Sequence, residues 1–186
     1  MDVLRLTTNH QIGKGTEMKK AIILLSVMLI GVYGYADEPA VDLKAGIKRR
    51  TEEDRKTYTM EQLREIEALY QLANKDLKDP GAKEALKALI EKYPKANRTG
   101  CAVQYIAQMS TGEDREKYLK LAIKDFSDCF YGNGVQVGAY ARYYLGYYYE
   151  EKGKEKEAKA LFDEIRKDYP NAVNHKGKRL VDILPK

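Results

Sequence analysis

The chain has 186 residues, enough for one ordinary domain behind a leader, and 33% charged with 44% hydrophobic residues is normal for a globular protein. Its net charge of +5 is modest, and acidic and basic residues alternate along the chain instead of forming blocks. This pattern indicates solvated helix faces and excludes a phosphate-binding stripe, so we expect no nucleic-acid partner.

The N-terminal region has the pattern of a secretory signal peptide. A short basic segment starting at Met18 precedes the apolar run "AIILLSVMLIGVY", and Gly34 and Ala36 take the small-residue positions before a cleavage site. We expect residues 18–36 to be removed and residues 1–17 to be a doubtful upstream extension, leaving a periplasmic or secreted bacterial protein. The apolar run is shorter than the roughly 20 residues of a relaxed membrane helix, so we expect no stable membrane span after cleavage, and an uncleaved anchor is the alternative.

The rest of the chain divides into an arm and a helical domain. Residues 37–58 are polar and lack a clear apolar period, which predicts a flexible charged arm, helical toward its end. Residues 59–186 predict six antiparallel helices with short turns, a C-terminal cap and no convincing strand. Thr59 and Gln62 have the spacing of a capping box at the first helix start.

Two of the predicted hairpins repeat each other at a shift of 76 residues. The shift takes Leu69, Ala82, Leu86, Leu89, Tyr93, Pro94 and Ala96 to Leu145, Ala158, Phe162, Ile165, Tyr169, Pro170 and Ala172. The hairpin between them shows a weaker echo at Ala122 and Phe126, and its longer interval predicts a longer loop around "KANRTG". A single hairpin cannot cover its own apolar face, so the recurrence predicts stacked hairpins.

Over roughly residues 60–172 the chain resembles the tetratricopeptide repeat (TPR) family, in particular its exported bacterial envelope members. The residues that carry the resemblance in the last unit are Leu145, Gly146, Tyr149, Ala158, Phe162 and Pro170. The resemblance implies an all-α fold, a short TPR-like α-solenoid of about three antiparallel hairpins. Gly146 and Ala158 are small where two helices cross closely. The resemblance also implies a scaffold that binds other proteins on its concave side.

The first helix of the last hairpin carries rings where a surface helix usually carries charges. At 100° per residue, Tyr140, Tyr143 and Tyr147 lie opposite the core face, together with Glu150 and Glu151. In the resembled family this helix lines the concave surface, which implies that these five residues bind a protein or peptide partner. A rigid ring with a polar tip suits binding. Packing on the preceding hairpin or beneath the C-terminal tail is the alternative, and both stay open.

The two cysteines, Cys101 and Cys129, lie at the open end of one predicted hairpin. An even count in an exported protein favours a disulfide. The two helices differ in length, which can separate the thiols beyond bridging distance. A possible disulfide and a pair of buried thiols are therefore equal alternatives.

The sequence offers little for catalysis. His175 has the context of a solvated loop histidine, "GNGVQVG" lacks the spacing and the preceding strand of a phosphate loop, and no cluster has zinc spacing. We expect no enzyme, no metal and no cofactor. The alternatives to a protein-binding scaffold are an envelope glycan-binding module, a purely structural oligomer and an enzyme that uses carboxylates alone.

Overall fold

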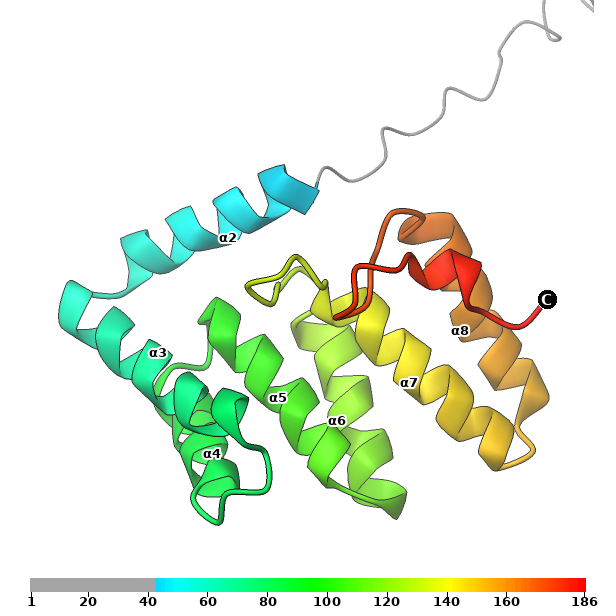
Figure 1. The fold of residues 1–186 in the computed structure, drawn as a ribbon, viewed down its shortest axis with the longest axis horizontal. Coiled ribbons are helices and arrows are strands. Elements are labelled where there is room, and N and C mark those ends of the chain that lie inside the picture. Colours follow the sequence, from blue (N-terminus) through cyan, green and yellow to red (C-terminus); the bar gives the residue numbers. More distant parts are fainter. Residues whose placement is uncertain (1–42) are drawn as a thin grey trace, which may run out of the picture. The chain divides into compact units, whose positions relative to one another are not determined.

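The computed structural model describes residues 43–186, and in this part of the chain the fold is all-α, as predicted. Figure 1 shows the helices in chain order. Their bounds are α2 (Leu43–Thr57), α3 (Met60–Lys75), α4 (Ala82–Lys92), α5 (Asn97–Met109), α6 (Gly112–Asp125), α7 (Val137–Glu151), α8 (Glu155–Asp168) and the 3₁₀ helix η1 (Leu180–Asp182). Extended pairing within these residues is limited to two isolated bridges, Phe130 with Gln136 and Val173 with Arg179.

Three helical hairpins follow one another: α3 with α4, α5 with α6, and α7 with α8 (Figure 1). The second helix of each hairpin also packs on the first helix of the next, so the core runs continuously through the stack. The first helices α3, α5 and α7 contact one another in sequence, whereas no comparable contact joins α4 to α6 or α6 to α8 in the described residues. The first helices therefore form the inner side of the stack, as expected for a TPR-like solenoid.

The beginning of α3 confirms the predicted capping box. The Thr59 hydroxyl accepts the N–H of Gln62 at 3.2 Å, and the Gln62 side chain accepts the N–H of Thr59 at 2.9 Å. Two of the orphan donors at the helix start are thereby satisfied. Asp79 does not cap the next helix, because its carboxylate accepts the N–H of Gly81 at 2.7 Å and α4 begins only at Ala82.

The crossing of α7 and α8 has the predicted small residues. A methyl group at Gly146 would lie 2.4 Å from Cε1 of Phe162, closer than any carbon contact allows. Phe162 and Ala158 are buried, at 3% and 1% exposure, beside Leu145 at 3%. Glycine at this position lets the two helix axes approach and lets Phe162 fill the space between them.

The middle hairpin is repeated in a different register from the one expected. The residue that follows the second helix is Phe126 in the middle hairpin, Tyr93 in the first and Tyr169 in the last. These three positions are equivalent, since the N–H of each donates to the carbonyl four residues earlier. This superposition places Leu119 with Leu86 and Phe162, the three large side chains at the crossings, all at most 3% exposed. The expected match of Ala122 to Ala82 and Ala158, and of Phe126 to Leu86 and Phe162, is therefore wrong.

The extra residues of the repeat also lie elsewhere than predicted. Helix α5 begins at Asn97, directly after Ala96, so "KANRTG" contains no long loop. The insertion is residues 130–136, between the end of α6 and the start of α7. Asn97 holds it, because its side-chain amide donates to the carbonyl of Phe130 at 2.8 Å and accepts the N–H of Phe130 at 2.7 Å.

Residues 43–57, expected to belong to a flexible arm with helix toward its end, form the continuous helix α2. The helix has long straight-chain residues with good helix propensity, and Arg49 pairs with Glu53 one turn later at 2.9 Å. Arg49 also pairs with Asp128 at 3.1 Å, and Gly46 lies against the ring of Phe130. These contacts, invisible in the local pattern, attach the polar helix to the hairpins.

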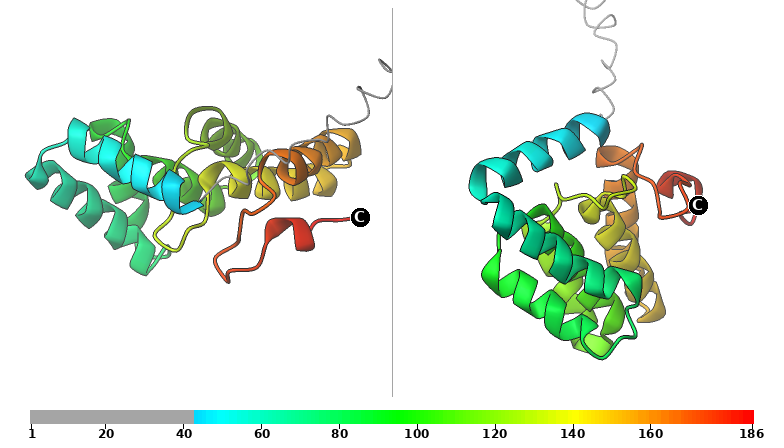
Figure 2. Two further views of the ribbon diagram at one scale, coloured as in Figure 1. Left: turned by 90° about the horizontal axis from the view of Figure 1, so that it is seen from above. Right: turned by 60° about the vertical axis from the view of Figure 1, so that its left-hand side comes forward.

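The C-terminal segment packs on the last hairpin. Leu180 is fully buried, and Val181, Ile183 and Leu184 are half-buried against the core. Helix η1 contacts α8, and Figure 2 shows the segment from two further directions. The predicted signal peptide, its cleavage site and the upstream extension lie outside the described residues. Among residues 43–186, no helix has the length and apolar content of a membrane span.

Candidate functional site

A row of ring contacts begins on the inner side of the first hairpin. Tyr70 of α3 stacks on Tyr105 of α5, with centroids 5.8 Å apart and planes 9° apart. Tyr105 contacts Tyr131 at 5.3 Å, and Tyr131 meets the imidazole of His175 edge-on at 4.8 Å. His175 meets Tyr140 of α7 in the same way at 5.0 Å. Side chains from three helices and two loops are thus joined by continuous ring contacts.

The row continues along α7 to the last helix. Tyr140 contacts Tyr143 at 6.0 Å, Tyr143 contacts Tyr147 at 4.9 Å, and Tyr147 contacts Phe162 of α8 at 5.2 Å. Tyr144 lies beside the row, 4.8 Å from Tyr140. We call Tyr70, Tyr105, Tyr131, His175, Tyr140, Tyr143, Tyr147 and Phe162 the aromatic row.

The predicted partner-binding residues separate into three environments. Tyr143, Tyr147 and Glu151 line one hollow of about 300 Å³. Tyr140 is buried beneath them, at 8% exposure, and its hydroxyl bonds to that of Tyr144 at 3.1 Å. Glu150 is exposed and lines a different hollow, against α8 and the C-terminal residues.

Tyr147 combines both of the arrangements considered from the sequence. Its ring lies half-buried on the inner side, next to Tyr143. Its hydroxyl donates to the carbonyl of Ile183 at 3.1 Å, so the C-terminal segment covers its tip. Burial raises the pKa of Tyr147, with the hydroxyl of Tyr143 and the carboxylate of Glu150 adding to the effect. The hydroxyl therefore stays protonated and holds the tail in place.

Two loops of the same construction rise beside the aromatic row. A shift of 43 residues takes residues 129–137 onto residues 172–180, and both loops have a bridge and a glycine at positive φ, Gly134 at 86° and Gly177 at 74°. Three backbone hydrogen bonds also correspond between the loops. In the first loop, Tyr131 N–H donates to Val135 O, Gly134 N–H to Tyr131 O and Val137 N–H to Cys129 O. In the second loop, the equivalent bonds run from Asn174 to Lys178, from Gly177 to Asn174 and from Leu180 to Ala172. The shared glycine was the only sequence signal for these twin loops, because the side chains around it differ.

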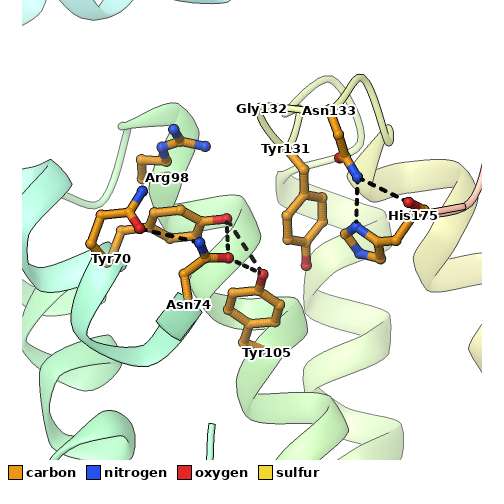
Figure 3. Close-up of a pocket in the computed structure, with 9 residues that line it drawn as sticks. Tyr70, Asn74, Arg98, Tyr105, Tyr131, Gly132, Asn133 and His175 are labelled. Carbon is orange, nitrogen blue, oxygen red and sulfur yellow. Dashed lines mark hydrogen bonds between the residues drawn. The ribbon is translucent and has the colours of Figure 1, made fainter. Parts of the chain in front are cut away.

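The twin loops close one side of a pocket of about 270 Å³ on the inner surface. Figure 3 shows Asn133 and His175, one from each loop, across from Tyr70, Asn74 and Tyr105. His175 remains exposed, as predicted for a loop histidine, yet its ring packs on two tyrosines and lines the pocket. The sequence did not indicate this pocket, because its walls come from segments far apart in the chain.

The two cysteines are free, and both are buried at 1% exposure or less. The structure therefore shows the two thiols unjoined, and alkylation without reductant tests whether they are so in the protein. Burial raises the pKa of the Cys129 thiol to about 12 and raises that of Cys101 further. Neither forms a reactive thiolate near neutral pH. Close packing explains the burial, since Cys129 lies directly against Gly100 of α5.

The described residues offer no obvious metal centre. Within residues 43–186, no group of three or more histidine, cysteine, aspartate or glutamate side chains is placed to hold an ion. Near the aromatic row, Glu67 forms an ion pair with Arg98 at 2.9 Å.

Comparison with protein families gives one match, at two places in the chain. The tetratricopeptide repeat model matches residues 67–96, in the first hairpin, and residues 140–172, in the last. These matches support a tetratricopeptide repeat protein, a class of non-enzymatic scaffolds that generally mediate protein–protein interaction. The middle hairpin lies outside both matches. No curated protein and no solved structure matches the chain.

Proposed function

We propose that this protein is an exported bacterial scaffold that binds an extended segment of a protein partner along its aromatic row. Export rests on the signal-peptide pattern of residues 18–36. The observation that carries the binding proposal is the row itself, which crosses all three hairpins and includes the half-buried rings of Tyr143 and Tyr147.

Half-buried tyrosines suit partner binding better than fully buried ones. The buried end of the row, Tyr70 and Tyr105, stabilises the contact between hairpins, since these rings are 3% and 8% exposed. Tyr143 has ring area left for a partner, and its neighbours restrict its torsions, so binding costs little side-chain entropy. The carboxylate of Glu151 and the guanidinium of Arg115 line the same hollow, so it offers both an acceptor and donors to a polar residue of the partner.

The proposal is tested by Tyr143→Ala, with Tyr118→Ala as the matched control. Both tyrosines are half-buried, but Tyr118 lies on α6 outside the aromatic row. Each substitution removes a partly buried ring and should lower the free energy of unfolding by about 1–2 kcal/mol. We expect Tyr143→Ala to lose the partner that the wild-type protein retains in a pull-down from the native envelope, and Tyr118→Ala to keep it.

The other outcomes contradict the proposal in distinguishable ways. If both variants retain the partner and Tyr143→Ala loses far more stability, the row is only packing. If the protein binds purified peptidoglycan through Tyr143 and retains no protein, it is a glycan-binding module. If light scattering shows that the row joins copies of this chain, it is a structural oligomer.

A further inference from the structure

The pocket beside the twin loops has the size of a subsite for one side chain. Its volume of about 270 Å³ is below the range of about 300–1,000 Å³ that is usual for small-molecule sites. It lies on the inner side of the stack, where His175 joins its tyrosines to the rest of the aromatic row. A segment bound along the row can therefore insert one residue here.

The charged side chain that lines the pocket, Arg98, is paired with Glu67, which lies outside the lining. Arg98 donates from Nε to Glu67 at 2.9 Å and from Nη2 at 3.3 Å, and Gln71 donates to the same carboxylate at 2.6 Å. Burial alone would raise the pKa of Glu67, but these hydrogen bonds outweigh it and lower the pKa. Glu67 therefore stays ionised and offsets the charge of Arg98. An anion in the pocket is therefore attracted less strongly than it would be by an unpaired Arg98.

Hydrogen bonds also fix the orientation of the side chains on the helix wall of the pocket, which we define as Tyr70, Gln71, Asn74 and Tyr105. The carbonyl oxygen of Asn74 accepts the hydroxyl of Tyr105 at 2.7 Å and that of Tyr70 at 3.2 Å, and its amide nitrogen donates to Gln71 at 3.2 Å. Burial raises the pKa of both tyrosines, so the hydroxyls remain donors to Asn74. The second amide hydrogens of Asn74 and Gln71 remain as donors, and the two phenolic oxygens remain as acceptors.

The loop wall of the pocket, formed by Asn133 and His175, also offers both hydrogen-bond donors and acceptors. The amide nitrogen of Asn133 lies 3.1 Å from Nδ1 of His175 and can only donate, so the imidazole proton is on Nε2. Packing of the ring against Tyr131 and Tyr140 removes part of its hydration and lowers the pKa of His175 below its ordinary value, which keeps the ring neutral at pH 7. The carbonyl oxygen of Asn133 accepts no hydrogen bond from residues 43–186, and Nε2–H of His175 makes none within them. One acceptor and one donor therefore remain on this wall.

The rings of this pocket present their edges and hydroxyls, so they form no stacking platform. Tyr70 and Tyr131 are 3% and 2% exposed, and the guanidinium of Arg98 covers the Tyr70 face at 4.2 Å from its centroid. A sugar ring that needs an open aromatic face has none here. A carboxylate has no hydrogen to donate to the oxygen of Asn133, and an ammonium has no acceptor for Nε2–H of His175.

We propose that this pocket binds a primary carboxamide, the side chain of a glutamine or asparagine in the partner segment. A carboxamide presents a planar pair of donors and a carbonyl acceptor, and each wall of the pocket provides the complementary functions. On the helix wall these are the amide hydrogens of Gln71 and Asn74 and the phenolic oxygens of the two tyrosines, and on the loop wall they are Asn133 and His175. The inference rests on the proposed function, since it names the residue type that the partner would contribute.

The test uses blocked pentapeptides of sequence Gly-Ser-X-Ser-Gly, acetylated at one end and N-methylamidated at the other, with X as glutamine, glutamate, lysine or leucine. Their effects on the ¹⁵N-labelled protein are followed by NMR. We expect the glutamine peptide to shift the side-chain amide signals of Gln71 and Asn133, and to bind at least about tenfold more tightly than the others, because they leave polar groups unpaired. Equal binding of the glutamate or lysine peptide, the same shifts with N-acetylglucosamine instead, or no shifts at all would overturn the proposal.

Two surface variants sharpen the test. Asn133→Ala removes the acceptor of the loop wall and should abolish the preference for glutamine, whereas Lys176→Ala, next to His175 but outside the pocket, should keep it. An unchanged preference in Asn133→Ala contradicts the proposal. If the protein prefers the glutamine peptide but Tyr143→Ala still captures the partner, only the proposed function is refuted. If Tyr143→Ala loses the partner but the protein shows no preference for glutamine, only the carboxamide subsite is refuted.

Discussion

Replacing Gly146 by alanine should destabilise the last hairpin, although the same change usually stabilises a helix. The new methyl group would lie 2.4 Å from Cε1 and 2.8 Å from Cζ of Phe162. Phe162 is 3% exposed and has no room to turn away. Overpacking costs about 1–3 kcal/mol, and contacts this short with a buried ring belong to the upper part of that range, about 2–3 kcal/mol. The better helix propensity of alanine returns about 1 kcal/mol. The net loss in the free energy of unfolding is therefore about 1–2 kcal/mol.

The loss is measured by denaturant unfolding, with Gly132→Ala as the control. Gly132 lies in the loop before α7, and a methyl group there would meet no atom closer than 3.9 Å, so we expect a change within about 0.5 kcal/mol. Phe162→Leu should be less harmful in the Gly146→Ala background than in the wild type, because leucine leaves space for the methyl group. A Gly146→Ala protein at least as stable as the wild type would refute the close crossing of α7 and α8.

Three further predictions concern groups in or near the core. Cys101 and Cys129 should resist alkylation in the native protein at pH 8 and should both react after unfolding without reductant; an unfolded protein with no reactive thiol would show a disulfide instead. The free energy of unfolding should fall as the pH drops below about 6.5 and through the lowered pKa of His175, because the unfolded chain then binds the proton more readily than the folded chain. Asn133→Ala removes the hydrogen bond to the neutral ring and should reduce this pH dependence. An NMR titration that places the pKa of His175 at or above its ordinary value would contradict the prediction. Gln104 is fully buried and neither of its amide atoms has a partner in residues 43–186, so Gln104→Met should raise the free energy of unfolding by about 1 kcal/mol; a loss instead would show that the amide is satisfied in solution.

The features predicted correctly are those encoded by neighbouring residues in one or two helices. The capping box needs only Thr59 and Gln62, and the crossing needs only a small residue opposite a large one, as at Gly146 and Phe162. The predicted register of the middle hairpin was wrong because Arg115 occupies the position that the other two hairpins fill with Ala82 and Ala158, so the repeat pattern is weak there.

Features that depend on distant residues were not accessible in this way. Helix α2 is held by the pairing of Arg49 with Asp128, far along the chain, and its own polar pattern gave no sign of that contact. The pocket joins α3 and α5 to the twin loops, and His175 acquires its position from two tyrosines on different elements. Tertiary placement therefore turned an ordinary loop histidine into part of the candidate site.

The partner-binding role of the inner surface is tested most directly by site-specific photocrosslinking in the native envelope. A benzophenone amino acid placed at Tyr143 samples the aromatic row, and the same group at Lys87, exposed on α4, samples the outer helices. We expect a discrete crosslinked protein from position 143 that is absent from position 87. Equal crosslinks from both positions, or products at 143 that contain only this chain, would contradict it.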